Sequence, residues 1–179
     1  MYPLLRLIKG DLTSRNAPPL PLTGTHVSYH LCWPWDIDPW AELNNGRTLT
    51  LYDLGRVPLA NRTGLRKALT DNKWGMTVAG SSVRYRRRVR MFDRVRMHSR
   101  CIGWDHRFLY IDQSMWNGDI CTSQALLRTA ITSRDGIVDP AHVAKVLNHD
   151  GPSPELPDWV KGWISADAER PWPPKVEDI

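Results

Sequence analysis

The chain has 179 residues, of which 41% are hydrophobic and 24% are charged, a composition typical of globular proteins that excludes wholesale disorder. A chain of this length favours one domain, and it can bury roughly 70% of the surface its unfolded form exposes without a disulfide or metal staple. The net charge of +5 is compatible with a nucleic acid, an anionic membrane or a polyanionic small molecule as partner. Composition does not choose among them.

Residues 1–22 are expected to form an N-terminal arm and linker. The apolar run in residues 1–10 is too short for a signal peptide or a membrane span, so we expect an amphipathic arm that packs on the body. Residues 11–22 are polar and then proline-rich, which is typical of a linker. The three cysteines show no CxxC spacing. We therefore expect a cytoplasmic protein with reduced thiols, no metal site, no cofactor and no membrane span.

A half-buried strand is predicted next, because apolar and polar residues alternate strictly. One face carries Val27, Tyr29, Leu31 and Trp33, and the other carries His26, Ser28, His30 and Cys32. His26 and His30 share a face but would lie about 13 Å apart on a strand, too far to share one metal ion.

A long helix is predicted from Asn44 or Asn45, whose side chains can cap the free N–H groups of a first turn. The helical period continues to Pro58, which should bend or break the helix, and a second helical piece runs to about Leu69. Asp71 and Asn72 would then close that piece as a turn.

Four strands are predicted in succession between residues 74 and 133. They cover about 75–90, 95–101, 108–116 and 120–132. Asn117-Gly118 between alternating runs favours a tight hairpin turn with positive φ. Two of these strands show regular alternation. One face of the strand at 95–101 carries Val95, Met97, Ser99 and Cys101. One face of the strand at 120–132 carries Ala125, Leu127, Thr129 and Ile131.

The last segment, residues 134–179, should be a C-terminal helix and a Pro/Trp-rich tail packed on the domain. Asp139 is the expected cap and Pro140 the first helical residue. One long helix with one antiparallel sheet gives an α+β fold of two layers.

The segment from Asp36 to Asn45 resembles the motif of hotdog-fold acyl-CoA thioesterases, those typified by hydroxybenzoyl-CoA thioesterase and the "thioesterase superfamily member" proteins. That motif runs roughly Asp-x-Asp-x-x-Gly-His-Val-Asn-Asn, followed by a helix that here reads Tyr-Asp-Leu-Gly-Arg at residues 52–56. The resemblance covers residues 23–133 and implies a single hotdog domain, its antiparallel sheet wrapped on one long central helix. Ala41 replaces the family glycine, and Glu42 replaces the family histidine.

The resemblance implies hydrolysis of an acyl-CoA, with Asp38 matching the family's catalytic aspartate as nucleophile or general base. Free N–H groups at the helix start, around Ala41, Asn44 and Asn45, would hold the oxyanion. Asp38 has a structural alternative, in which its carboxylate caps a turn before Pro39. Asn44 and Asn45 have one too, as helix cap and loop brace.

Glu42 is a second candidate carboxylate. It could act as a base or raise the pKa of its neighbour by like-charge repulsion. It could equally be a solvent-facing acid favoured by the helix dipole.

Arginines cluster in residues 84–90 of the strand predicted at 75–90. Three of them, Arg84, Arg86 and Arg88, are candidates for binding the phosphates of coenzyme A, because guanidinium groups match phosphate oxygens. A solvated strand face is the plainer interpretation. Nucleic-acid binding is not favoured, since no RNA-binding or helix-turn-helix motif accompanies the cluster.

Two further functions stay open beside hydrolysis. A non-catalytic hotdog module that binds an acyl group or serves assembly is favoured by Glu42 in place of histidine. A hotdog dehydratase would need a histidine beside the carboxylate, and none stands near Asp38. The resemblance also implies a homodimer, or a dimer of dimers, with sites at the subunit interface.

Overall fold

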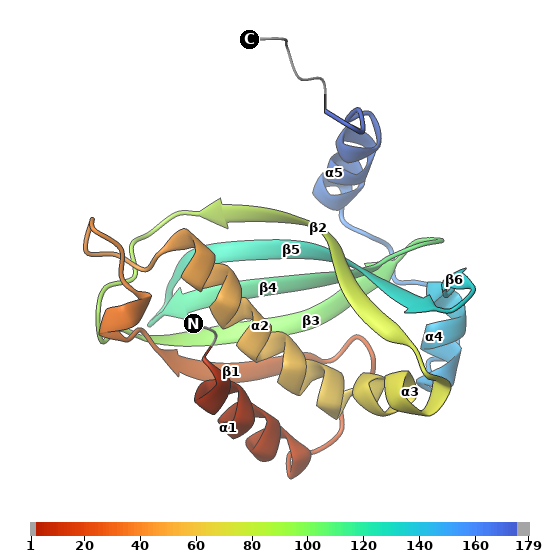
Figure 1. Cartoon of the computed structure of the whole chain (residues 1–179), viewed down its shortest axis with the longest axis horizontal. Coiled ribbons are helices and arrows are strands. Elements are labelled where there is room, and N and C mark those ends of the chain that lie inside the picture. Colours follow the sequence, from red (N-terminus) through yellow and green to blue (C-terminus); the bar gives the residue numbers. More distant parts are fainter. Residues whose placement is uncertain (1–2, 175–179) are drawn as a thin grey trace.

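An antiparallel sheet curls around one long helix in the computed structural model, which describes residues 3–174 (Figure 1). The strand order is β1-β3-β4-β5-β2, with β6 paired to β5. The strands are β1 (Thr25–Leu31), β2 (Gly75–Tyr85), β3 (Arg94–Trp104), β4 (Leu109–Asn117), β5 (Ile120–Ser133) and β6 (Gly136–Ile137). The helices are α1 (Leu4–Arg15), α2 (Asn45–Arg62), α3 (Leu65–Asn72), α4 (Pro140–Val146) and α5 (Asp158–Ala168). The predicted α+β layering is confirmed.

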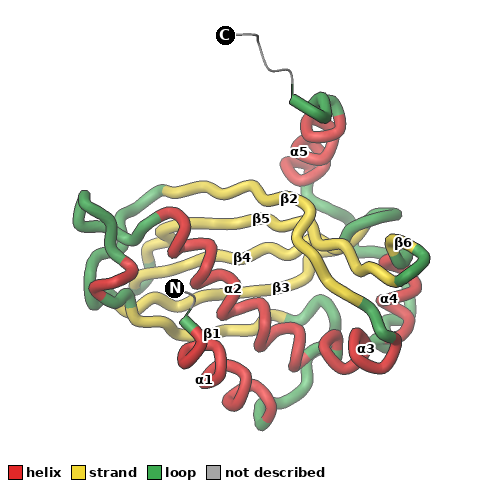
Figure 2. Tube along the Cα trace, viewed as in Figure 1, coloured by secondary structure: helices red, strands yellow, loops and turns green. Residues whose placement is uncertain are grey.

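The core lies between α2 and the concave face of the sheet. Figure 2 shows α2 running across that face. Both alternating faces expected from the sequence point into it, because every second side chain of a strand lies on the same side. On β3, Val95 and Met97 are fully buried, and on β5 Ala125 and Ile131 are too. Burial of these faces fixes the register of the meander.

Gly55 allows α2 to lie very close to the sheet. A Cβ atom at this position would stand 2.5 Å from Met97 Sδ and 2.7 Å from Ser99 Oγ. The side chain of Gln113, fully buried on β4, donates to the backbone oxygen of Tyr52 at 2.9 Å and accepts from Arg56 at 2.8 Å. The helix is therefore joined to the sheet by buried hydrogen bonds as well as by apolar packing.

The helix break falls elsewhere than predicted. Helix α2 continues through Pro58 and ends at Arg62, so Pro58 does not end it. The chain turns at Gly64, whose φ of +78° is easily adopted only by glycine, and α3 begins directly after it. Asn72 belongs to α3 rather than to a closing turn.

Strand β1 points its apolar face outward and its polar face inward, the reverse of what is expected for a half-buried strand. Its apolar residues Val27 and Tyr29 are 41% and 59% exposed on the outer face, where the guanidinium of Arg94 stacks over Tyr29. Its inward face is polar, with His26 buried and Ser28 and His30 partly buried. The reason is that β1 is an edge strand whose inner side contacts α2 and borders a groove lined by polar and charged residues of α1.

The predicted linker begins later than residue 11, because helix α1 extends to Arg15. Helix α1 packs on α2 through polar contacts: Asn61 donates to Asp11 and to Ser14, each at 2.8 Å. The proline-rich segment follows, and Leu22 returns to the core.

Two strand boundaries also differ. Strand β2 ends at Tyr85, not near residue 90, because the N–H groups of Arg86 and Arg87 both turn to the backbone oxygen of Thr122. The β4–β5 hairpin is present, but its turn residues are Gly118 and Asp119, with positive φ at Gly118.

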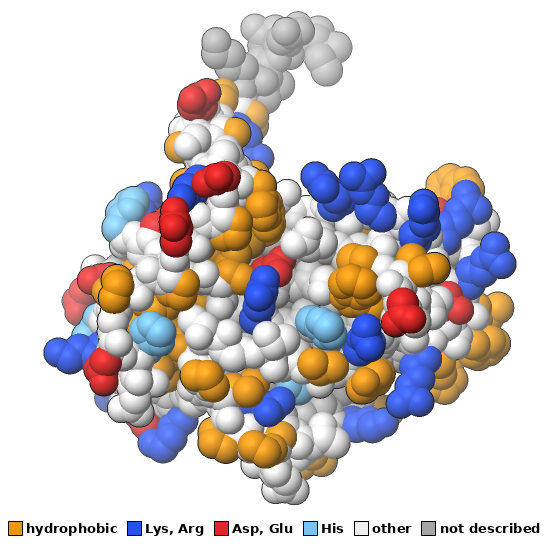
Figure 3. Space-filling view, turned by 180° about the vertical axis from the view of Figure 1, so that it is seen from behind, with side chains coloured by type: hydrophobic (Ala, Val, Ile, Leu, Met, Phe, Trp, Pro, Cys, Tyr) orange, Lys and Arg blue, Asp and Glu red, His pale blue; other side chains and the backbone are white. Residues whose placement is uncertain are grey.

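The C-terminal helices match the expectation. Asp139 caps α4 by accepting from the Ala141 N–H at 2.9 Å, with Pro140 in the first turn. Helix α5 places the buried side chain of Val160 against Tyr110 and Leu126 on the outer face of the sheet. Figure 3 shows this outer face from behind, where hydrophobic patches are interspersed with charged and other polar side chains below the protruding α5.

Candidate active site

The loop from β1 to α2 is anchored by Asp36, whose side chain is only 2% exposed. Its carboxylate accepts from Arg6 at 2.7 Å and from the Trp33 N–H at 3.1 Å. Its backbone oxygen accepts from the Asn44 N–H at 2.9 Å. Both of these hydrogen bonds reach Oδ2, and Arg47 Nε lies 3.8 Å from Oδ1, so the buried carboxylate lies between two arginines and supports the loop.

Asp38 holds the turn that follows. Its Oδ1 accepts from the Trp40 N–H at 2.9 Å and, more weakly, from the Glu42 N–H at 3.4 Å. Its backbone pairs with Glu42 and with Ala41. Asp38 thus caps this turn with its side chain, which is the structural alternative to a catalytic role. Its Oδ2 accepts no hydrogen bond from residues 3–174 and stays open for another partner.

Ala41 adopts φ of +58°, the left-handed region that L-residues rarely enter. This explains why glycine occupies the corresponding position of the motif. The backbone keeps the shape of the motif although the residue differs.

Asn44 is the N-cap of α2. Its Oδ1 accepts from the N–H groups of Gly46 at 2.9 Å and Arg47 at 3.2 Å, and its backbone oxygen accepts from Thr48. Two of the first-turn N–H groups expected to face an oxyanion are therefore occupied. The N–H of Asn45 makes no hydrogen bond with other described residues, so it is the free donor at this helix start.

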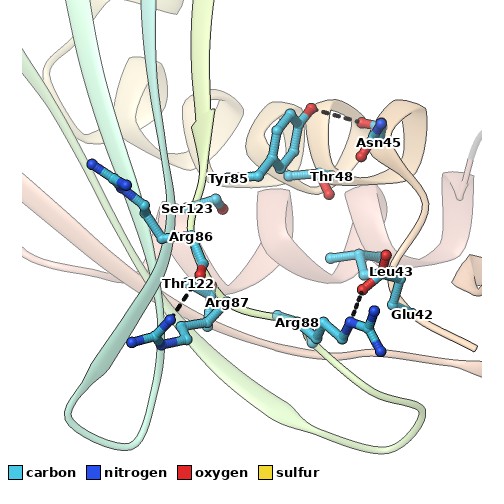
Figure 4. A pocket seen from close by; sticks show the side chains of 11 residues that line it. Glu42, Leu43, Asn45, Thr48, Tyr85, Arg86, Arg87, Arg88, Thr122 and Ser123 are labelled. Carbon is cyan, nitrogen blue, oxygen red and sulfur yellow. Dashed lines mark hydrogen bonds and ion pairs between the residues drawn. The ribbon is translucent and has the colours of Figure 1, made fainter.

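A pocket of about 200 Å³ opens beside this helix start (Figure 4). Glu42, Leu43, Asn45 and Thr48 line it from the loop and α2. The opposite wall comes from the end of β2 and from β5, with these lining residues: Tyr85, Arg86, Arg87, Arg88, Val89, Thr122 and Ser123. The pocket therefore combines one carboxylate, several hydroxyl groups and a cationic segment.

Glu42 and Arg88 face each other across this pocket, with Arg88 Nε 2.9 Å from Glu42 Oε2. The pairing arises because the Leu43 N–H donates to the backbone oxygen of Val89 at 2.8 Å, which brings the loop and the post-β2 segment together. Tyr85 reaches the backbone oxygen of Asn45 at 3.5 Å. Partial burial raises the pKa of Tyr85, so its phenol stays a neutral donor at neutral pH.

The structure brings together only part of the predicted set. Glu42, Asn45, Arg86 and Arg88 line the pocket. Arg84 does not, because it lies on the opposite face of β2 from Tyr85. Asp38, Ala41 and Asn44 form the loop behind the pocket rather than its wall.

Sequence reasoning missed four hydroxyl residues of the pocket: Thr48, Tyr85, Thr122 and Ser123. Thr48 follows Asn45 by three residues and so shares its helix face, a spacing readable from the sequence. Ser123 lies opposite Tyr85 in the β2–β5 register and accepts or donates a 2.8 Å hydrogen bond with buried Tyr52. The position of Ser123 in the pocket depends on the register between β2 and β5, which cannot be read from the sequence.

Comparison with known proteins places these features in a family. The family model described as "Thioesterase-like superfamily" matches residues 32–164, which includes the loop, α2 and the whole meander. The chain belongs to this superfamily. Its relatives include Protein THEM6 of Drosophila melanogaster, 30% identical over 148 residues that cover 81% of this chain and 75% of that protein. Protein THEM6 of Xenopus laevis is 27% identical over 164 residues, covering 88% and 77%.

Solved structures show the same fold for this superfamily member. The probable thioesterase YbaW of Escherichia coli aligns with a TM-score of 0.64 at 12% identity, over 69% of this chain and 96% of that one. A 1,4-dihydroxy-2-naphthoyl-CoA thioesterase of Synechocystis aligns with a TM-score of 0.61 at 9% identity, over 71% and 97%. At such identities the likeness establishes the hotdog fold, as predicted. No helix within residues 3–174 has the length and apolar character needed to cross a bilayer.

Proposed function

We propose that this member of the thioesterase-like superfamily hydrolyses an acyl-CoA to a free acid and coenzyme A. The observation that carries the proposal is the pocket at the start of α2, where the open N–H of Asn45 lies among hydroxyl groups and arginines beside the Asp38 loop. A thioester needs a polarised carbonyl and an activated nucleophile, and this site supplies donors for the first and a carboxylate for the second.

Asp38 is the proposed nucleophile or general base. Two backbone N–H groups hold its Oδ1, while Oδ2 stays open. As a base, Oδ2 would take a proton from water as the water oxygen attacks the thioester carbon. The C–S bond then breaks, and the departing thiolate takes up a proton to give coenzyme A. The Asn45 N–H is the proposed donor to the transient oxyanion.

Glu42 is the proposed second carboxylate, at the position of the family histidine. Its ion pair with Arg88 keeps it in the pocket wall. The exposed arginines Arg86, Arg87 and Arg88 supply positive charge for the phosphates of coenzyme A. Arg84 remains a candidate for the same role, from its exposed position on β2.

A homodimer is proposed to complete the site. Strand β2 is an edge strand, and nine of its eleven residues are exposed. An exposed edge strand offers unpaired backbone groups to a second chain. A second copy paired along β2 would cover Met76 and Val78, which are 45% and 44% exposed. Light scattering on the purified protein tests whether it is a dimer.

A non-catalytic acyl-binding or assembly module is the competing function. Two observations favour it: Asp38 already caps a turn, and Glu42 is already paired with Arg88. A module of this kind would bind an acyl-CoA and release it unchanged.

Thiol release from a panel of acyl-CoA chain lengths separates the two functions. For the hydrolase, we expect at least one chain length to be turned over, and Asp38→Asn to lower kcat by about a hundredfold, the contribution of one acid–base group. Glu42→Gln in the same assay measures how much the second carboxylate contributes to kcat. Asp135→Asn, an exposed turn carboxylate at the opposite end of the sheet, is the matched control and should keep full activity.

Binding without turnover across the whole panel would support the module instead. Unchanged turnover in Asp38→Asn would remove Asp38 from the chemistry and leave Glu42 to be judged by its own variant. Circular dichroism melts of each variant ensure that a loss of turnover is not a loss of fold.

A further inference from the structure

A groove lies between α1 and β1, whose places in the fold Figure 1 shows, and it shares no lining residue with the pocket of Figure 4. Its volume is about 610 Å³, and its floor is formed by Leu54 and Pro58 of α2. The polar inner face of β1, with His26, Ser28 and His30, forms one wall. The inverted strand pattern therefore has a consequence: polar side chains that would be unfavourable in a core line this groove instead.

The groove is cationic. Arg6, Lys9 and Arg62 line it, and none of its described lining residues is an aspartate or glutamate. Asp36 neutralises Arg6 from outside the groove. Within residues 3–174, no carboxylate forms an ion pair with Lys9 or Arg62. Two positive charges thus remain uncompensated beside an apolar floor.

His26 adds an unused hydrogen-bond donor. Its Nδ1 lies 3.0 Å from Arg62 Nη1, and because a guanidinium only donates, Nδ1 must be the acceptor. The proton of the neutral ring then sits on Nε2. That nitrogen is buried and has no hydrogen-bond partner among the described residues, and His26 as a whole is only 8% exposed. Because this nitrogen is covered by its neighbours, an acceptor in the groove reaches it only when lining side chains move, and such an acceptor would recover the free energy that the unpartnered donor costs.

We propose that the α1–β1 groove binds a monocarboxylate with a hydrocarbon chain. The carboxylate lies between Lys9, Arg62 and the Nε2–H of His26, and the chain lies on Leu54 and Pro58. A carboxylate with a hydrocarbon chain fits because Lys9 and Arg62 supply positive charge and Leu54 and Pro58 supply apolar surface, whereas a phosphate dianion would carry its hydration onto that surface. The proposal is independent of the hydrolysis at the other pocket.

The titration of the groove histidines supplies a direct readout. Burial, and secondarily the charge of Arg62, lowers the pKa of His26 to about 4. Burial, and secondarily Arg6, His26 and Lys9, lowers the pKa of His30 to about 4. A carboxylate bound beside these rings would oppose that effect, since an opposite charge favours the protonated ring. A ligand without charge would not.

The experiment follows the histidine ring signals by NMR while octanoate, octanol or inorganic phosphate is added to the full chain. We expect saturable shifts with octanoate, an increase of about 1 or more in the pKa of His26, and weaker or no binding of the other two. Lys9→Gln, at an exposed position of α1, and Arg62→Gln should each weaken octanoate binding by about tenfold. Lys67→Gln, an exposed lysine of α3 outside the groove, is the charge-matched control and should bind normally.

Four results would overturn the proposal. Octanoate could leave both histidines unshifted. Octanol could bind as tightly as octanoate, which would show that the negative charge is not recognised. Phosphate could bind as tightly, which would show that the hydrocarbon chain is not recognised. Lys67→Gln could weaken binding as much as Lys9→Gln, which would make the effect one of net charge. If Arg62→Gln fails to fold, Lys9→Gln decides the outcome.

Discussion

Arg88 Nε lies 2.9 Å from Glu42 Oε2, and the two side chains are 70% and 31% exposed. Asp36 lies in the same loop as Glu42, and its carboxylate, 2% exposed, lies 2.7 Å from Arg6 of helix α1. Both carboxylates lie on the loop between β1 and α2, but the Arg88–Glu42 pair is far more exposed to water than the Arg6–Asp36 pair. Their contributions to stability should therefore differ strongly.

We predict that Arg88→Gln lowers the free energy of unfolding by less than about 1 kcal/mol, because an exposed pair is screened by solvent. Asp36→Asn should lower it by about 3 kcal/mol or more, because Arg6 keeps a charge that loses its buried partner. Urea unfolding of both variants measures the difference. Equal losses would contradict the assignment of Asp36 as the loop anchor.

Gly55→Ala should destabilise the protein by about 1–3 kcal/mol, because the added methyl group enters the space of Met97 and Ser99 in the core. Gly162 of α5 is the matched control: a Cβ there meets no atom within 4 Å. Gly162→Ala should raise stability by up to about 1 kcal/mol through helix propensity alone. Thermal melts that move in the same direction for both variants would refute the close approach of α2 to the sheet.

Ala41→Gly should stabilise the protein by about 0.5–1 kcal/mol. Glycine removes the strain of the left-handed backbone at φ of +58°, and this gain exceeds the extra entropy of glycine in the unfolded chain. Ala166→Gly, at an exposed position of α5, should do the opposite and cost about 1 kcal/mol. Chemical denaturation of the two variants checks the sign, and a loss at residue 41 would mean that the loop relaxes without strain.

Acid should destabilise the folded chain through His26 and His30. Burial lowers the pKa of both to about 4, from 6.5 in the unfolded chain. Between these values the unfolded state binds more protons, so stability is fully present above about pH 6.5 and falls as the pH drops toward 4. Each histidine accounts for up to about 3 kcal/mol over this window.

The pH dependence of urea unfolding measures this effect. His26→Gln and His30→Gln should each flatten the curve between pH 6.5 and 4, while His106→Gln, an exposed turn residue, should leave it unchanged. A curve that keeps its slope in both groove variants would show that these histidines do not titrate as described.

Local patterns determined much of the fold. Strict alternation on β3 and β5 predicted their buried faces, because a strand places every second side chain on one side. Asp139-Pro140 predicted the start of α4, because capping involves only neighbouring residues. The loop motif and Tyr-Asp-Leu-Gly-Arg predicted the central helix and the superfamily, which the comparisons confirmed.

Tertiary structure decided what depends on distant neighbours. Alternation in β1 could not reveal which face is buried, since that depends on α1 and on the strand's position at the sheet edge. The arginine run could not reveal that β2 ends at Tyr85, because the Thr122 carbonyl that ends it belongs to another strand. The sequence alone established the strand periods, the caps and the motif, because these are local. Only the packing of α1, α2 and the sheet set Glu42 against Arg88 and left His26 facing a cationic groove, because burial and charge pairing act between segments far apart in the chain.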